Sequence, residues 1–249
     1  MSVLVDSHVH IYPHYDAAMA LSAFAARVRD ADAACGVMML AEREGVDQFA
    51  RWAEGAAPPG YAVAPSDATA LVLRKPGQPD IVIVAGRQIA CAERVEILAL
   101  ATRATFRDGT PAHQAVAESL AAGALPALAW GVGKWLFKRA AVVAGLLDAF
   151  PCADLAIADP SLRPVFWPTP RPMAKAAASG RRVLAGSDPL PPKGEAARIG
   201  QYADLAATAS LDFAAPLTPQ IAALLRGAPL RPVGRRAGPL EFLRRMSGN

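Results

Sequence analysis

Two histidines near the start of the chain, His8 and His10, have the type and spacing that a metal site needs. They end an apolar, β-branched run that begins at Val3 and precedes Tyr12-Pro13, which predicts a buried strand over about 3–8 opening into a loop. Side chains alternate along a strand, so positions 8 and 10 point to the same side and both imidazoles can reach one ion. A metal pair at the carboxyl end of a first strand predicts a catalytic site in an α/β protein.

Two segments carry a family resemblance. Asp6-Ser7-His8-Val9-His10-Ile11-Tyr12-Pro13 resembles the first-strand motif of the amidohydrolase superfamily, in particular its amidohydrolase-related branch. Val183-Leu184-Ala185-Gly186-Ser187-Asp188-Pro189 is similar to the final-strand motif of that branch, whose aspartate binds metal and handles a proton. The resemblance implies a metal-dependent hydrolase on a TIM-barrel-like (β/α) barrel, regular or distorted, in which Asp188 is both metal ligand and catalytic residue. The Asp-x-His-x-His start also resembles PHP-type phosphoesterases, and His14 is the candidate for their third early histidine.

The chain departs from the amidohydrolase pattern in its middle strands, which usually supply further histidines. It has four histidines in all, and His113 is the only one beyond residue 14. His113 follows Thr110-Pro111, a pair that predicts the start of a helix, so we expect an ordinary first-turn residue there. The number of metal ions therefore stays open, as does a third interpretation, a metal-poor barrel that serves as a binding or scaffold subunit.

Length and composition favour one folded domain over 1–249. A (β/α) barrel needs about 250 residues, and 53% hydrophobic residues with a mean hydropathy of +0.22 argue against disorder. No apolar stretch approaches the roughly 20 residues of a membrane span, and the start lacks the features of a signal peptide. Cys35, Cys91 and Cys152 are widely spaced and form no Cys-x-x-Cys, which predicts reduced thiols in a cytoplasmic protein.

Positive charge is concentrated in a basic C-terminal segment, 226–249. Six arginines and one acid, Glu241, lie between Arg226 and Arg245, and the rest of the chain is close to neutral. Basic patches alone are weak motifs, and no aromatic residues interleave with these arginines for base stacking. We interpret the segment as a solvated helix without a clear nucleic-acid or membrane signal. The expected partner is a small-molecule substrate, with the oligomeric state open.

Strands and helices alternate along most of the chain, which predicts a parallel sheet or barrel. A β-hairpin-like irregular region around 69–101 interrupts this order, because two apolar runs flank Lys75-Pro76-Gly77-Gln78-Pro79-Asp80. The other strands are predicted over about 36–41, 95–100, 125–130, 154–158 and 182–186. Helices are predicted over about 16–32, 48–54, 111–122, 135–149 and 171–179.

Acidic residues at two further strand ends are candidates for chemistry. Glu42 follows the second strand and is a candidate metal ligand, although an exposed glutamate opening a helix fits equally well. Asp159 follows the strand predicted over 154–158 and directly precedes Pro160. It is a candidate proton shuttle, with a turn or N-cap role as the alternative.

Basic residues near strand ends are candidates for substrate contacts. Gly133 and Lys134 lie where a strand ends and a helix begins, a place where backbone amides and a positive charge can meet a phosphate or carboxylate. Tight packing of the turn with the lysine in solvent is the alternative. Arg87-Gln88 and Arg163 are candidates on position alone.

These groups predict a metal-activated water that attacks an acyl, amide or lactone substrate, or a phosphoryl centre in the PHP-like alternative. His8, His10 and Asp188 hold the divalent ion, and Asp188 or Asp159 moves the proton. Imidazole and carboxylate ligands suit zinc first, with manganese or iron as alternatives.

Overall fold

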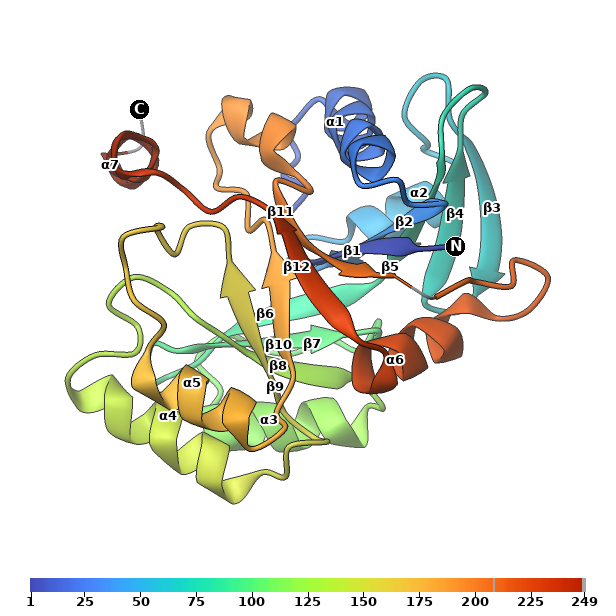
Figure 1. Ribbon diagram of the computed structural model, residues 1–249. Coiled ribbons are helices and arrows are strands. Elements are labelled where there is room, and N and C mark those ends of the chain that lie inside the picture. Colours follow the sequence, from blue (N-terminus) through green and yellow to red (C-terminus); the bar gives the residue numbers. More distant parts are fainter. Residues whose placement is uncertain (208, 248–249) are drawn as a thin grey trace.

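Two mixed β-sheets form the centre of the protein in a computed structural model, which describes residues 1–207 and 209–247 (Figure 1). The seven-stranded sheet has the order β12-β11-β1-β2-β5-β4-β3, and the five-stranded sheet has the order β10-β9-β8-β7-β6. The last two positions of the basic segment 226–249 lie outside the described residues. The strands are β1 (Val3–Val9), β2 (Cys35–Leu40), β3 (Ala62–Asp67), β4 (Ala70–Arg74), β5 (Asp80–Val84), β6 (Gly86–Ala90), β7 (Glu96–Leu100), β8 (Leu125–Ala129), β9 (Ala156–Pro160), β10 (Val183–Gly186), β11 (Tyr202–Ala206) and β12 (Leu230–Gly234). The helices are α1 (Ala17–Asp30), α2 (Gln48–Ala53), α3 (Ala112–Ala121), α4 (Lys138–Ala149), α5 (Arg171–Ala178), the 3₁₀-helix η1 (Lys193–Arg198), α6 (Leu217–Gly227) and α7 (Pro239–Ser247).

The predicted (β/α) barrel is wrong. Such a barrel needs parallel strands that each lead into a helix, whereas β4 pairs antiparallel with both β3 and β5, and β7 pairs antiparallel with both β6 and β8. After β10 the chain also returns antiparallel, since β11 pairs that way with β1 and with β12. Among the described residues the strands form two separate mixed sheets, not one closed parallel barrel.

Several local predictions are confirmed. The hairpin across Lys75–Asp80 exists, with Leu71 opposite Ile83 in an antiparallel ladder. The first strand, the second strand and the helices near 16–32, 48–54, 111–122 and 171–179 lie within a few residues of their predicted bounds. The strands β3, β6, β11 and β12 were not predicted, because short runs with few apolar residues, such as Ala62–Asp67, give a weak strand pattern.

Alternation along the strands divides the core into layers. Val3, Val5, Val37 and Met39 join apolar side chains of the five-stranded sheet in a core between the two sheets. Leu4 and its neighbours on the other face pack against α1, while the outer face of the five-stranded sheet packs against α3, α4 and α5. In Figure 1 these three helices lie together on one side of the molecule, and α1 lies on the opposite side.

The two sheets come close at two glycines. A Cβ on Gly186, at the end of β10, would lie 2.5 Å from the Cβ of His8, and a Cβ on Gly86 would lie 2.3 Å from the carbonyl oxygen of Leu40. Only a residue without a side chain allows these approaches. Gly186 therefore brings β10 against β1, and Gly86 brings β6 against the end of β2.

Side-chain carboxylates bridge the gap between β10 and the seven-stranded sheet. Asp6 accepts a hydrogen bond from the Ser187 amide at 2.8 Å, and Asp204 on β11 accepts one from the Ala185 amide at 2.7 Å. These backbone amides thus bond to buried carboxylates in place of strand carbonyls. No helix in the part of the chain that the structure describes has the length and apolar character of a membrane span.

Candidate metal centre

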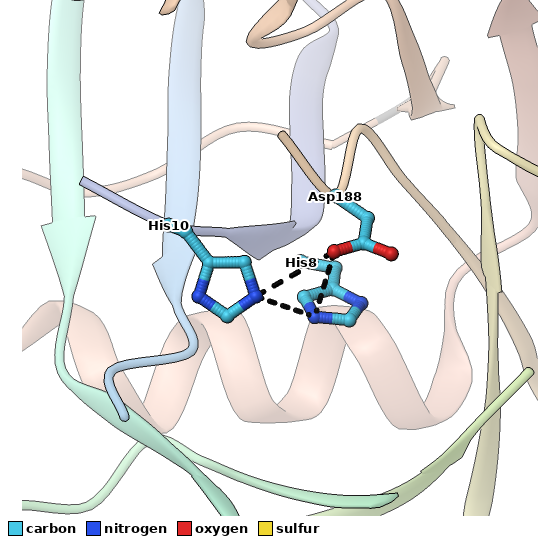
Figure 2. A group of neighbouring side chains, drawn as sticks. All are labelled: His8, His10 and Asp188. Atoms are coloured by element: carbon cyan, nitrogen blue, oxygen red, sulfur yellow. Dashed lines mark hydrogen bonds and ion pairs between the residues drawn. The ribbon is translucent and has the colours of Figure 1, made fainter. Parts of the chain in front are cut away.

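Three side chains from distant parts of the sequence converge in what we call the His-His-Asp triad: His8, His10 and Asp188 (Figure 2). The Nε2 atoms of His8 and His10 are 3.1 Å apart. Each of these nitrogens lies 3.5 Å from Oδ1 of Asp188. The structure therefore brings together the histidine pair and the aspartate that the two sequence motifs pointed to.

A register shift in β1 directs the two histidines. The pairing of β1 with β2 is irregular between Asp6 and Val9. Before the shift the odd-numbered Val5 faces the core between the sheets. After the shift the odd-numbered Val9 packs on the opposite face, against α1, so odd and even positions have exchanged faces. Irregularities of this kind re-aim side chains. His8 and His10 consequently point to the inner side, toward the end of β10.

Backbone contacts hold Asp188 in place. Its φ of 46° lies in the left-handed region, which is uncommon for a residue with a side chain. The Asp188 amide donates to the carbonyl of His8 at 2.8 Å, and Arg245 of α7 donates to the carbonyl of Asp188 at 3.0 Å. Strained backbone supported from both sides is typical of functional sites.

The charges in the triad favour an ionised Asp188 beside a neutral His10. Burial alone would raise the pKa of Asp188, but the two histidines and Arg245 hold it well below its usual range. Burial and the neighbouring His8 lower the pKa of His10 despite the contact with Asp188. Neutral imidazoles and an ionised carboxylate are the forms that bind a metal ion.

The donor set fits a divalent cation. Two imidazole nitrogens and a carboxylate oxygen suit zinc, manganese or iron. In the described part of the chain the buried Nδ1 of His8 has no hydrogen-bond partner, so no protein acceptor holds a proton on that nitrogen. A cation at Nε2 would select the form that is protonated at Nδ1, which leaves the lone pair facing the triad.

The triad borders a cavity of about 390 Å³. Its lining combines His10 and Asp188 with the cationic side chains of Arg43 and Lys134, the carboxylate of Glu96 and the indole of Trp130. Lys134 forms an ion pair with Glu96, and both side chains are partly exposed. The predicted basic residue after β8 thus lies in the same cavity as the triad, while its neighbour Gly133 does not line it.

Glu42 lies outside the triad in a buried cluster of its own. Its carboxylate pairs with Arg87 at 2.7 Å and accepts hydrogen bonds from the Gln48 and Phe49 amides at the start of α2. Burial raises the pKa of Glu42 to about 7. Arg87 also pairs with Asp47 at 2.9 Å, so its guanidinium is held by protein carboxylates.

Asp159 also lies outside the triad. It forms two hydrogen bonds of 2.6 Å with the guanidinium of Arg163, and Tyr202 donates to it at 3.3 Å. Both partners of the ion pair are buried. The structure therefore places the predicted proton shuttle and the predicted substrate contact Arg163 in one paired unit.

The remaining histidines are not in the triad. His14 contacts the carbonyl of Pro191, and His113 lies in the first turn of α3 against Phe150. Two residues near the site were not anticipated: Arg245, which belongs to the basic segment interpreted as solvated, and Glu96. Neither had a distinguishing signal, since a single charge in a basic run or at a strand start has many ordinary roles.

Comparisons with known proteins give similarity at the level of fold. No protein-family model matches this chain, and no curated protein matches it. Among solved structures, PsfC from Pseudomonas syringae PB-5123 is similar at 14% identity with a TM-score of 0.58, over 94% of this chain and 91% of that one. The lesion-specific endonuclease PfuEndoQ from Pyrococcus furiosus is similar at 13% identity with a TM-score of 0.55, over 94% of this chain. The chain spans 59% of the endonuclease, and nothing found shows membership of the amidohydrolase superfamily.

Proposed function

We propose that the protein is a metal-dependent hydrolase that acts on a phosphate ester. The observation that carries the proposal is the His-His-Asp triad beside a cavity that also presents Arg43 and Lys134. The triad supplies ligands for a divalent cation, and the two basic side chains suit an anionic substrate group. The fold similarity to an endonuclease, an enzyme that cleaves phosphodiester bonds, favours a phosphoryl over an acyl centre.

The residues around the cavity would each have a separate role in hydrolysis. A divalent cation held by the triad would lower the pKa of a coordinated water toward 7 and polarise a phosphoryl oxygen. The low pKa of Asp188 keeps its carboxylate ionised, which suits a metal ligand, and its second carboxylate oxygen would take the proton of the nucleophile only in passing to solvent. Lys134 and Arg43 would orient the phosphate group, and Trp130 closes one wall of the cavity.

The test measures metal content first and hydrolysis second. We expect the parent protein to retain a stoichiometric divalent metal by elemental mass spectrometry, and the His8→Ala/Asp188→Ala double variant to retain none. The loaded parent is then assayed with zinc or manganese on p-nitrophenyl phosphate, bis-p-nitrophenyl phosphate and p-nitrophenyl acetate. Turnover of a phosphate ester supports the proposal. Turnover of the acetate alone would favour an acyl hydrolase, and a parent without metal after dialysis against both ions would favour a non-catalytic subunit.

A further inference from the structure

The amide oxygen of Gln88 belongs to the same convergence of atoms as the triad. Gln88 Oε1 lies 3.1 Å from His8 Nε2, the nitrogen that is also 3.1 Å from His10 Nε2 and 3.5 Å from Asp188 Oδ1. A neutral imidazole nitrogen carries either one proton or one lone pair, so a single hydrogen bond can satisfy only one of these three neighbours. With a proton on His8 Nε2, a second proton on His10 Nε2 would set two N–H groups face to face at 3.1 Å, and without it the lone pairs of His10 Nε2 and Asp188 Oδ1 face each other at 3.5 Å.

We propose that Gln88 supplies a fourth protein ligand, through Oε1, to the cation held by the triad. This inference rests on the proposed function, because it assumes that the triad binds a metal ion. A cation among the four atoms would satisfy two imidazole nitrogens, a carboxylate oxygen and an amide oxygen together. Carbonyl-type oxygens are accepted ligands of divalent ions, and they suit manganese better than thiolate or imidazole ligands do.

The backbone fixes Gln88 at this place independently of its side chain. The backbone N–H of Gln88 donates to the backbone carbonyl of Glu42 at 2.9 Å, and the backbone N–H of Glu42 donates to the carbonyl of Gly86 at 3.0 Å. These bonds hold β6 against the end of β2, where only glycine at position 86 permits the approach. Ile89 packs on the outer face of the five-stranded sheet, against α3 and α4. Its neighbour Gln88 therefore faces the opposite side, toward β1.

A plain hydrogen bond between His8 and Gln88 makes the opposite prediction. If Gln88 only accepted a proton from His8 Nε2, it would stabilise the tautomer that cannot bind a metal at that nitrogen. Removing the amide would then leave the affinity for metal unchanged or increase it. A ligand role requires that the affinity falls. The two interpretations therefore differ in the sign of one measurable quantity.

The experiment compares Gln88→Met, which has a similar length but no amide oxygen, with Gln88→Glu, which keeps an oxygen at that reach. The Kd for Mn²⁺ and Co²⁺ is measured by competition with a chelator, and the visible absorption of bound Co²⁺ reports the ligand set. We expect Gln88→Met to weaken binding about tenfold or more, since even residues that only support ligands are worth 10–100-fold, and to change the Co²⁺ spectrum. Gln88→Glu should bind at least as tightly as the parent.

Controls separate this inference from the proposed function. Gln114→Met, on the exposed face of α3 beside Glu118, is the matched substitution and should leave the Kd unchanged. A parent that binds metal and a Gln88→Met variant with the same Kd would overturn the ligand role of Gln88 alone. A parent that binds no metal would overturn both proposals. If Gln88→Met does not fold, weaker binding by Gln88→Glu than by the parent would still contradict the inference.

Discussion

Acidic side chains near the meeting of the two sheets occur in two different settings. Asp188 faces two imidazole nitrogens, whereas Glu42 and Asp159 each face the guanidinium of an arginine at 2.6–2.7 Å. We call the latter the arginine-paired carboxylates. A carboxylate with a bound guanidinium already has its counter-charge, whereas the carboxylate of Asp188 has two imidazole nitrogens beside it and Arg245 bonds to its backbone carbonyl. The difference teaches that the partner of a carboxylate, rather than its place at a strand end, identifies a candidate metal ligand.

The largest expected effect is the loss of metal from the triad. His10→Ala removes one of three ligands from a buried position, so we expect no stoichiometric metal in a protein that still folds. Elemental mass spectrometry gives the metal content, and circular dichroism checks the fold. His113→Ala, an exposed histidine outside the triad, is the matched control. If the folded His10→Ala variant retained as much metal as the parent, His10 would not be a ligand, and the triad would not differ from the arginine-paired carboxylates in metal binding.

An arginine-paired carboxylate should affect stability instead. Asp159→Asn leaves the guanidinium of Arg163, which is only 4% exposed, without its counter-charge. We expect the free energy of unfolding in urea to fall by about 3–5 kcal/mol, with metal content unchanged. The double variant Asp159→Asn/Arg163→Met should recover much of that loss. If the folded Asp159→Asn protein also lost its bound metal, Asp159 would have to contribute to the metal site, contrary to this prediction.

Asp204 is a further buried carboxylate, with no ion pair to an arginine or lysine among the described residues, and it predicts a dependence on pH. Burial raises the pKa of Asp204 to about 7, from the ordinary value of 3.8. The folded state keeps this proton between roughly pH 4 and pH 7 while the unfolded chain loses it, so the stabilisation is complete below pH 4 and disappears as the pH rises through 7. Asp204→Asn should make the free energy of unfolding less dependent on pH in this window, by up to about 4 kcal/mol. The measurement is urea denaturation from pH 5 to pH 8, and identical slopes in the two proteins would contradict the assignment.

Arg245 connects α7 to the triad and should have an intermediate effect. It donates to the carbonyl of Asp188 and to Ser161 Oγ, both at 3.0 Å, and pairs with Glu195 at 2.8 Å. Arg245→Met should weaken metal binding about tenfold by loosening Asp188, in line with other groups that orient ligands. The exposed neighbour Arg244 provides the control Arg244→Met. Equal Kd values for metal would restrict Arg245 to holding the helix.

The smallest expected effect is at Lys134. It lines the cavity but is already paired with Glu96, so Lys134→Ala should weaken the binding of inorganic phosphate only about two- to fivefold, the worth of a partly exposed ion pair. Titration calorimetry on the metal-loaded protein measures this, with the exposed Lys138→Ala as control. A loss of metal in Lys134→Ala would show that the lysine acts on the triad rather than on the anion.

Local pattern was enough to predict much of the site and part of the fold. The alternation of His8 and His10 and the hairpin across Lys75–Asp80 could be predicted from residue types and spacing. The assignment of Asp188 to the same metal ion came from the family resemblance of its motif. The register shift in β1 could not, since it depends on pairing with β2 rather than on any residue in the run. The choice between barrel and two sheets also depends on long-range pairing, here on the antiparallel returns at β6 and β11.

The arginine pairs were beyond prediction for a related reason. Glu42 and Asp159 follow buried strands just as Asp188 does, so their sequence neighbourhoods resemble one another. Their arginine partners differ in sequence separation: Arg163 is close to Asp159, whereas Arg87 reaches Glu42 only through the isolated bridge between positions 42 and 87. Which charge meets which carboxylate is decided by packing between elements.

The triad also has a mechanical consequence, because its ligands come from strand β1 near the N-terminus and from the turn after β10. A cation there would tie together two points at the ends of a loop that contains most of the chain, as a cross-link does. Such a tie exists only in the folded state, so binding would add RT ln(1 + [metal]/Kd) to the free energy of unfolding. Chelation would then lower the melting temperature along with any activity, and metal supply would govern how much of the protein stays folded.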